Sequence, residues 1–218
     1  SHTLHYGNGA IEGTKAYKTV DGRCAIFKLN EHTKRLLNSS KMTLMNVPFT
    51  LEELNKAQIE LLQKNELFNG AYIRPLVYLG YGVMGLYHKD APVKVSVSAW
   101  EWGAYLGEKL LRLTVSSYCR PHPKSIHIEA KICGHYVNSI LATTEAKDKG
   151  FDEALLLDSD GFLAEGPGAN LFFEKDGKLF TPQLGNILPG ITRSTVLELA
   201  EQLGLEVQQG NFTKEDLL

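Results

Sequence analysis

The spacing of hydrophobic positions predicts two helices in the first third of the chain. In residues 30–46 apolar side chains recur at roughly helical spacing, and Asn30 can cap the first turn. The second helix begins at a capping box, in which the side chains of Thr50 and Glu53 each accept a hydrogen bond from the other's backbone N–H. The predicted apolar faces consist of Leu36, Leu37, Met42 and Leu44 in the first helix and of Leu54, Ala57, Leu61 and Leu62 in the second.

After residue 70 the pattern changes to that of extended strands. Residues 71–79 and 93–98 are rich in β-branched and aromatic side chains, and the second segment alternates cleanly between valine and polar residues. The regular pattern breaks at residues 100–107, where aromatic residues stand between glycines without a period. We interpret this segment as a connector and expect a domain boundary there.

The second half of the chain mixes strands and helices. Strands are predicted at 111–118 and 153–158, and a helix at 134–149 that Gly150 ends. The turn residues Asp160-Gly161 and Asp176-Gly177 follow, the latter closing a hairpin within residues 171–181. A last helix spans 191–203, with an apolar side formed by Val196, Leu197, Leu199, Ala200 and Leu203.

These elements predict an α+β protein of two domains. The first domain spans residues 1–99, a short interdomain loop spans 100–109, and the second domain spans 110–218. We also expect the chain to be incomplete at both ends. Ser1 leads almost directly into a segment typical of a fold interior, and Thr213 begins a helix that stops at Leu218.

Composition narrows the class of protein. With 218 residues, 43% hydrophobic and 22% charged, the chain resembles an ordinary globular enzyme in the cytoplasm. A net charge of −2 gives no electrostatic reason to expect nucleic acid or an anionic membrane as a partner. The three cysteines are widely spaced and form no C-x-x-C pair, which favours reduced thiols and no metal site.

Three segments together indicate a pyridoxal 5'-phosphate site. Lys131 lies in a mostly uncharged segment and offers an amine for a Schiff base. Glu165 precedes a glycine-rich turn and offers a carboxylate for the protonated pyridine nitrogen. Pro189-Gly190-Ile191-Thr192 opens a helix whose free N–H groups suit a phosphate.

Taken singly, each of these residues has an ordinary alternative. Most lysines are solvated surface groups, and Glu165 can simply accept backbone hydrogen bonds in its loop. Many helices begin with glycine, and an arginine such as Arg35 most often forms a surface salt bridge. The aromatic residues of the strands and connector can be core residues with polar tips.

The order of the segments resembles the branched-chain amino acid aminotransferases, which are fold-type IV pyridoxal phosphate enzymes. The matching segments cover nearly the whole chain. They are His5-Tyr6-Gly7, Glu12-Gly13, His32-x-x-Arg35-Leu36, Ala71–Pro75, Met84-Gly85, Trp102–Tyr105, Glu129–Lys131, Tyr136, Glu165–Phe172 and Leu188–Arg193.

This resemblance implies a small α/β N-terminal domain, a larger β-rich C-terminal domain and a homodimer or higher homo-oligomer. It implies that Lys131 carries the cofactor and moves the proton, and that Glu165 contacts the ring nitrogen. Tyr136 would bind the phenolic oxygen of the cofactor. The implied phosphate ligands are Arg35, Gly190, Ile191 and Thr192, and the implied substrate-pocket residues are Tyr6, Ile11, Tyr72, Arg74, Met84, Leu86, Trp102 and Tyr105. The substrates implied are leucine, isoleucine and valine, with 2-oxoglutarate as the amino acceptor and Arg74 as the partner of the glutamate side chain.

Three departures from the family pattern are expected to matter. The family's later Thr-Gly-Thr-type turn lies beyond Leu218, its opening strands precede Ser1, and the segment 106–111 is short. We therefore expect the 218 residues not to form a complete active site by themselves. Two alternatives stay open: another fold-type IV enzyme (a D-amino-acid aminotransferase or an aminodeoxychorismate lyase) and a non-catalytic phosphate- or nucleotide-binding module.

Overall fold

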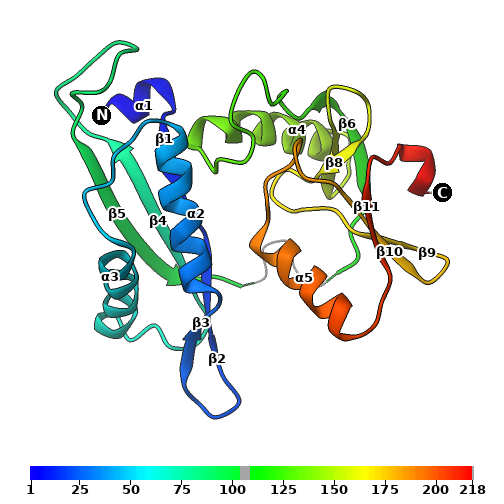
Figure 1. Ribbon diagram of the computed structural model, residues 1–218, viewed down its shortest axis with the longest axis horizontal. Helices are drawn as coiled ribbons and strands as arrows, with labels where there is room; N and C mark the ends of the chain where they lie inside the picture. Colours follow the sequence, from blue (N-terminus) through cyan, green and yellow to red (C-terminus); the bar gives the residue numbers. More distant parts are fainter. Residues whose placement is uncertain (104–108, 218) are drawn as a thin grey trace. The chain divides into compact units, whose positions relative to one another are not determined.

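The computed structural model describes residues 1–103 and 109–217. These residues divide into two compact units, each of which is treated by itself (Figure 1). The first unit comprises the described residues of Ser1–Lys109 together with Ala130–Gly134, and the second comprises those of Leu110–Glu129 and His135–Leu218. The segment Ala130–Gly134, which lies within the predicted second domain, therefore belongs to the first unit. The division at 1–99, 100–109 and 110–218 stays a prediction.

The first unit is built on an antiparallel sheet centred on β4 (Ala71–Leu79). Strand β5 (Val93–Glu101) pairs with β4 along its whole length, from Ala71 opposite Glu101 to Leu79 opposite Val93. The other edge of β4 is shared by β1 (Gly9–Ile11) and β2 (Thr14–Lys18), and β3 (Cys24–Ile26) pairs with β2. Burial alternates strictly along β4, as expected for a strand whose successive side chains point to opposite faces.

Two helices, α2 (Leu29–Met42) and α3 (Leu51–Lys64), pack against each other and against this sheet (Figure 1). The capping box of Thr50 and Glu53 forms as predicted. A short helix, α1 (His2–Tyr6), precedes the sheet. The largest buried cluster joins Leu36, Val77 and Leu79 to Ala130 and Ile132, so the segment around Lys131 is part of this core.

The second unit contains two small three-stranded sheets. In one, β7 (Glu153–Leu157) pairs in parallel with β6 (Leu113–Cys119) and antiparallel with β8 (Leu163–Glu165). In the other, β10 (Lys178–Pro182) pairs antiparallel with β9 (Phe173–Lys175) and in parallel with β11 (Val207–Gly210). Helix α4 (Tyr136–Asp148) packs on β6 and β7, and α5 (Ile191–Gln202) connects β10 to β11 (Figure 1). Two single turns of 3-10 helix lie at Cys133–His135 and Lys214–Leu217.

Several helix details differ from the predicted ones. Lys28, in the left-handed conformation, precedes α2 in the cap position predicted for Asn30, and the amide oxygen of Asn30 instead accepts from Asn55 of α3. Helix α2 ends at Met42, and Leu44 is exposed. In α3 the buried position beside Leu54 and Leu62 is Gln58 and not Ala57. In α5 the buried residues are Ile191, Arg193 and Ala200, while Leu199 and Leu203 face solvent.

Candidate active site

The main chain of Lys131 is fixed within the first unit. Its N–H donates to Oγ of Ser39 (3.0 Å), and its carbonyl accepts from the N–H of Ile11 (3.0 Å). An isolated bridge between Ala10 and Ile132 continues this contact along the end of β1. Ala130 and Ile132 are buried, whereas Lys131 between them is partly exposed. In an extended segment successive side chains point to opposite sides. The side chains of Ala130 and Ile132 therefore anchor the segment in the core, and the side chain of Lys131 points to the opposite side.

Arg35 forms an ion pair with a fully buried acid, Glu12, and not with a surface residue. Nε of Arg35 lies 2.6 Å from Oε1 of Glu12, and Nη2 lies 3.0 Å from Oε2. Nδ1 of His32, one turn earlier on α2, lies 2.7 Å from Oε2 of the same carboxylate. Burial alone raises the pKa of Glu12, but the hydrogen bonds and charges of His32 and Arg35 outweigh it and hold that pKa below its usual value. Glu12 therefore fixes the plane of the guanidinium of Arg35.

Three of the predicted pocket residues form a cluster in the first unit. Nη2 of Arg74 donates to Oη of Tyr72 (2.6 Å), and the guanidinium lies 5.2 Å from the centre of the Tyr72 ring. The Trp102 ring meets the Tyr72 ring edge-on, with centres 4.8 Å apart. Gly13 makes room for this cluster, because a Cβ there would lie 2.1 Å from Oη of Tyr72. Burial raises the pKa of the Cys133 thiol, and a backbone hydrogen bond and the charge of Arg74 oppose this rise only in part.

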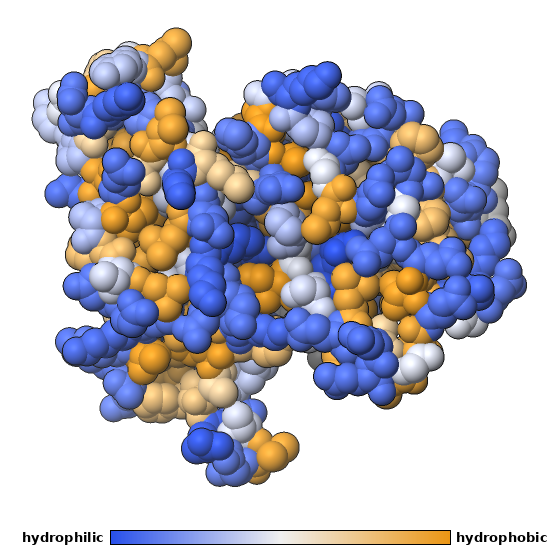
Figure 2. Space-filling view, in the orientation of Figure 1, coloured by the Kyte–Doolittle hydropathy of each residue, from blue (hydrophilic) through white to orange (hydrophobic). Residues whose placement is uncertain are grey.

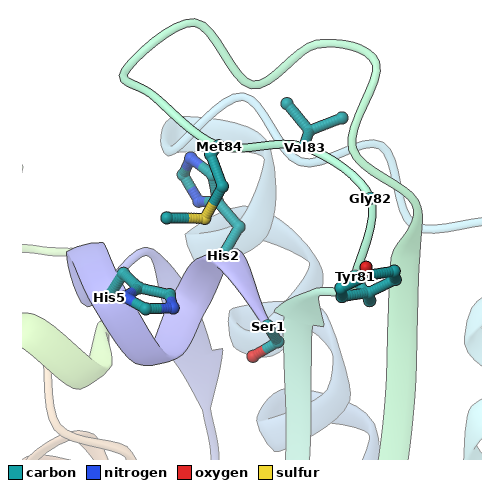
Figure 3. A pocket seen from close by; sticks show the side chains of 7 residues that line it. All are labelled: Ser1, His2, His5, Tyr81, Gly82, Val83 and Met84. Carbon is teal, nitrogen blue, oxygen red and sulfur yellow. The ribbon is translucent and has the colours of Figure 1, made fainter.

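Tyr6, Met84 and Leu86 belong to a second group, at α1 and the loop after β4. Oη of Tyr6 accepts from the N–H of Gly85 (3.1 Å), while Met84 and Leu86 are largely exposed. A pocket of about 180 Å³ opens here between α1, which contributes His2 and His5, and the loop segment Tyr81–Met84 (Figure 3). Because its lining includes Met84 but none of the predicted cofactor residues, we do not assign this pocket to the cofactor. The remaining predicted pocket residue, Tyr105, lies outside the described residues.

In the second unit, Glu165 ends β8 and is buried with three kinds of partner. Nε of Arg120 lies 3.0 Å from its Oε1, Nδ2 of Asn170 donates to its Oε2 (3.0 Å), and the N–H of Leu188 donates to the carboxylate at 3.2 Å. All three stabilise the ionised form of the acid. The charge that a buried carboxylate needs is therefore supplied by the chain itself as well as by any cationic ligand.

The same contacts join Glu165 to the start of α5. Nδ2 of Asn170 also donates to the carbonyl of Leu188 (2.9 Å), two residues before the cap of α5, Gly190. A Cβ on Gly190 would lie 1.8 Å from Oδ1 of Asn170, so any other residue here would displace the Asn170 side chain from these bonds. The N–H groups of Ile191 and Thr192 follow in the first turn, where no intrahelical carbonyl can accept from them. Tyr136 is the first residue of α4 and is partly buried.

The donor set fits pyridoxal phosphate. The first unit holds an amine at Lys131 and an oriented guanidinium at Arg35; the second holds a buried carboxylate fixed to a glycine-started helix terminus. A phosphate, an aldehyde and a protonated ring nitrogen each need one of these groups.

The comparisons with known proteins agree with this chemistry. The model of the family described as amino-transferase class IV matches residues 9–218. The chain belongs to the class IV aminotransferases. The branched-chain-amino-acid aminotransferase of Pseudomonas aeruginosa is 42% identical over 221 residues, which cover 100% of this chain and 71% of that enzyme.

Solved structures of other class IV aminotransferases superpose closely on this one. The branched-chain aminotransferase of the archaeon Thermoproteus uzoniensis, solved with norvaline, has a TM-score of 0.96 and 38% identity, covering 100% of this chain and 73% of that one. The T.th. branched-chain amino acid aminotransferase, complexed with N-(5'-phosphopyridoxyl)-L-glutamate, has a TM-score of 0.93 and 44% identity, covering 100% and 71%. The α+β class and the fold-type IV architecture predicted from the sequence are thus confirmed.

Four residues that contact the candidate site residues of this class IV aminotransferase were not predicted in those roles: Glu12, Ser39, Arg120 and Asn170. Glu12 and Asn170 stand inside segments that carry the family resemblance, yet no local pattern shows which side chain each would bind. Arg120 lies two residues after the predicted strand 111–118 and just before Pro121, and a charge in that place was the one available signal. Ser39 gives no signal, because a serine in a helix is ordinary.

Proposed function

We propose that the chain is a pyridoxal phosphate-dependent aminotransferase that acts on leucine, isoleucine and valine. It transfers their amino group to 2-oxoglutarate and gives branched 2-oxo acids and glutamate. The observation that carries this proposal is the identity of about two residues in five, over the whole chain, to branched-chain aminotransferases. The buried contacts that fix Lys131 within the first unit, and those that fix Glu165 within the second, support it.

Bound pyridoxal phosphate supplies a ring that withdraws electrons from the substrate's α-carbon. The chain's own groups hold that ring and move the proton. Nζ of Lys131 would take the proton from the substrate's α-carbon and deliver it to the carbon on the other side of the amino nitrogen. Glu165 would keep the ring nitrogen protonated, and Tyr136 would donate to the phenolic oxygen. Arg35 and the main chain of Gly190, Ile191 and Thr192 would hold the phosphate.

The proposed substrate pocket takes an aliphatic side chain and a carboxylate in turn. Ile11 and Trp102 offer apolar surface, joined in the family pattern by Tyr6, Met84, Leu86 and Tyr105. The Tyr72–Arg74 pair offers a charged group, and the glutamate adduct of the T.th. enzyme supports a need for one. The guanidinium of Arg74 then pairs with the side-chain carboxylate of glutamate.

The relatives and solved structures described above are branched-chain enzymes, so a D-amino-acid aminotransferase or an aminodeoxychorismate lyase is not favoured. A non-catalytic phosphate-binding module would not explain Lys131 together with Glu165. The cytoplasmic location stays a prediction. Within residues 1–103 and 109–217, no helix combines the length and apolar character that crossing a bilayer requires.

We further propose that the enzyme is a homodimer or a higher homo-oligomer. The loop after β4 carries four large hydrophobic residues exposed to solvent, namely Tyr81, Met84, Leu86 and Tyr87. Figure 2 shows hydrophobic surface in the region of this loop and α1, at the top left. A second copy of the chain that covers the loop would remove this surface from water.

Borohydride reduction of the cofactor-loaded protein tests the function. We expect a pyridoxyl group on Lys131, found by peptide mapping, and a visible absorption band that bleaches with L-leucine and not with D-leucine. Lys131→Ala should abolish the adduct, whereas the matched control Lys124→Ala, on an exposed loop, should retain it. A pyridoxyl group on Lys124 or another lysine would overturn the assignment.

A further inference from the structure

Lys131 is bound through its main chain on both sides. Its N–H donates to the hydroxyl oxygen of Ser39, and its carbonyl accepts from the N–H of Ile11, each at 3.0 Å. Both partners belong to the first unit, although the chain before Ala130 and after Gly134 belongs to the second. The segment that carries the lysine is therefore tied to a helix and a strand that lie far away in the sequence.

Those two elements also hold Arg35. Ser39 follows Arg35 by four residues on α2, so the two side chains lie on one face of the helix. Glu12 follows Ile11 directly and forms the two-pronged ion pair with Arg35. One helix face and one strand end thus fix both the proposed proton-moving residue and the proposed phosphate ligand.

The hydroxyl of Ser39 serves Lys131 and not its own helix. The usual solution for a buried helical serine is a bond to the carbonyl four residues earlier, and the neighbouring Ser40 makes that bond to Leu36 (2.9 Å). Ser39 is equally buried, at 1% exposure, and its oxygen accepts the N–H of Lys131. Serine is a modest helix former, so helix stability does not call for it at this position.

We propose that Ser39 is a positioning residue for Lys131. It holds the main chain of the lysine in one place, so that the amine keeps a single approach to the cofactor and to the substrate's α-carbon. Without the hydroxyl, the N–H of Lys131 has lost its acceptor, and the segment rearranges to find another. This inference rests on the role proposed above for Lys131.

Ser39→Ala and Ser40→Ala form a matched pair for testing this role. Both changes remove one hydroxyl from a buried position of the same helix, and Ser39 alone of the two contacts Lys131. The first measurement is the hydrogen-exchange rate of the Lys131 amide in the cofactor-free protein. The second is the rate at which added pyridoxal phosphate becomes reducible by borohydride onto Lys131.

We expect Ser39→Ala to accelerate exchange and to slow attachment, each by about tenfold, the effect of losing one buried hydrogen bond. Ser40→Ala should stay within about twofold of wild type in both, since its lost bond lies within the helix. Ser39→Thr keeps the hydroxyl and should restore both rates. Ser39→Cys has a weaker acceptor and should give intermediate values of both rates. If the alanine variant does not fold, the two rates are measured in the cysteine variant instead.

The outcomes separate the two proposals. If wild type attaches pyridoxal phosphate at Lys131 but the Ser39 and Ser40 variants behave alike, the positioning role is overturned and the proposed function stands. If wild type forms no adduct at Lys131, the proposed function fails and the positioning role falls with it.

Discussion

Glu165 is buried at the end of β8, where its carboxylate meets a guanidinium, an amide and a main-chain N–H. These partners hold the carboxylate of Glu165 in one position and one orientation. A fixed carboxylate can keep a pyridine nitrogen protonated while negative charge develops on the ring, and it needs no reorganisation to do so. The role proposed for Glu165 therefore predicts a contribution to the reaction step more than to the affinity for the cofactor.

Glu165→Gln tests this view. The amide fills the same space, but it cannot hold the ring nitrogen protonated, so we expect cofactor binding to survive. The half-reaction with leucine should slow by about two decades or more, as for the loss of one electrostatic group in an active site. Glu153→Gln, which changes another buried acid of the second unit, should leave the rate nearly unchanged. A near wild-type rate for Glu165→Gln in a stopped-flow measurement would refute its assignment to the ring nitrogen.

In the proposed function, Arg74 distinguishes the two kinds of substrate. An aliphatic side chain offers the guanidinium nothing, whereas the second carboxylate of glutamate gains a charge-assisted pair of about 1.5–3 kcal/mol. We expect Arg74→Ala to lower kcat/KM for glutamate by roughly one to two decades more than for leucine. Tyr72→Phe is the control, because it removes the 2.6 Å hydrogen bond to Arg74 but keeps the guanidinium. Equal losses for both substrates would mean that Arg74 serves the common α-carboxylate or the fold.

At the scale of elements, the sequence predicts best where the signal is local. The capping box at Thr50, the strand β4 and the Asp176-Gly177 turn all form as predicted, since neighbouring residues decide them. The start of α2 and the buried side of α5 were wrong, because distant residues decide them. The side chain of Asn30 accepts a hydrogen bond from Asn55 of α3 and does not cap α2. The side chain of Arg193 is buried because it donates to the carbonyl of Pro182 and to Gln209.

The candidate site shows the same limit. Family resemblance identifies Lys131, Glu165 and Arg35 as site residues, but it does not identify the residues that bind them. Ser39 binds Lys131 across 92 residues of sequence (131 − 39), and Arg120 binds Glu165 across 45 (165 − 120). No periodicity or spacing connects residues so far apart in one sequence. Such contacts become visible only when the fold brings the segments together.

The Glu12 network should make the stability of the first unit depend on pH. The pKa of Glu12 is held below its usual 4.5, so its stabilisation is present above that value and is lost as pH falls through the lowered pKa. We expect Glu12→Gln to lower the free energy of unfolding at pH 7 by about 3 kcal/mol, as for a broken buried ion pair. The difference from wild type should shrink below pH 4.5.

Tryptophan fluorescence during urea unfolding measures this difference, because both tryptophans of the chain, Trp100 and Trp102, lie in the first unit. Glu31→Gln is the matched control: it removes an exposed acid from α2, the helix that carries His32 and Arg35, and should cost less than about 0.5 kcal/mol. If the loss for Glu12→Gln stays the same as pH is lowered from 7 through 4.5 until the protein unfolds, Glu12 does not act through its charge.

At the scale of the whole molecule, the chain passes between its two units more than once. Ala130–Gly134 leaves the second unit, packs into the core of the first and returns at His135. The lysine is therefore anchored in one unit, while Tyr136 and Glu165 are anchored in the other. A chain arranged in this way cannot be cut at a single point into two working domains, so separate expression of 1–109 would lose the core residues Ala130 and Ile132.

The loop after β4 offers the sharpest test of the proposed oligomer. Leu86 at its centre is 85% exposed, so its replacement by a charge costs the isolated chain little. In a two-fold symmetric dimer, however, each residue of the interface occurs twice, and Leu86→Asp would bury two unpaired carboxylates. At about 2 kcal/mol each, the dissociation constant should rise by about three decades.

Light scattering coupled to size exclusion, run over a series of concentrations, would show this rise as a fall in mass from two chains to one. Val20→Asp places the same charge on another fully exposed hydrophobic residue, in the turn between β2 and β3, and should leave the mass unchanged. If Leu86→Asp keeps the wild-type mass at every concentration, a second copy does not cover this loop. The exposed residues Tyr81, Met84, Leu86 and Tyr87 would then need a different partner or purpose.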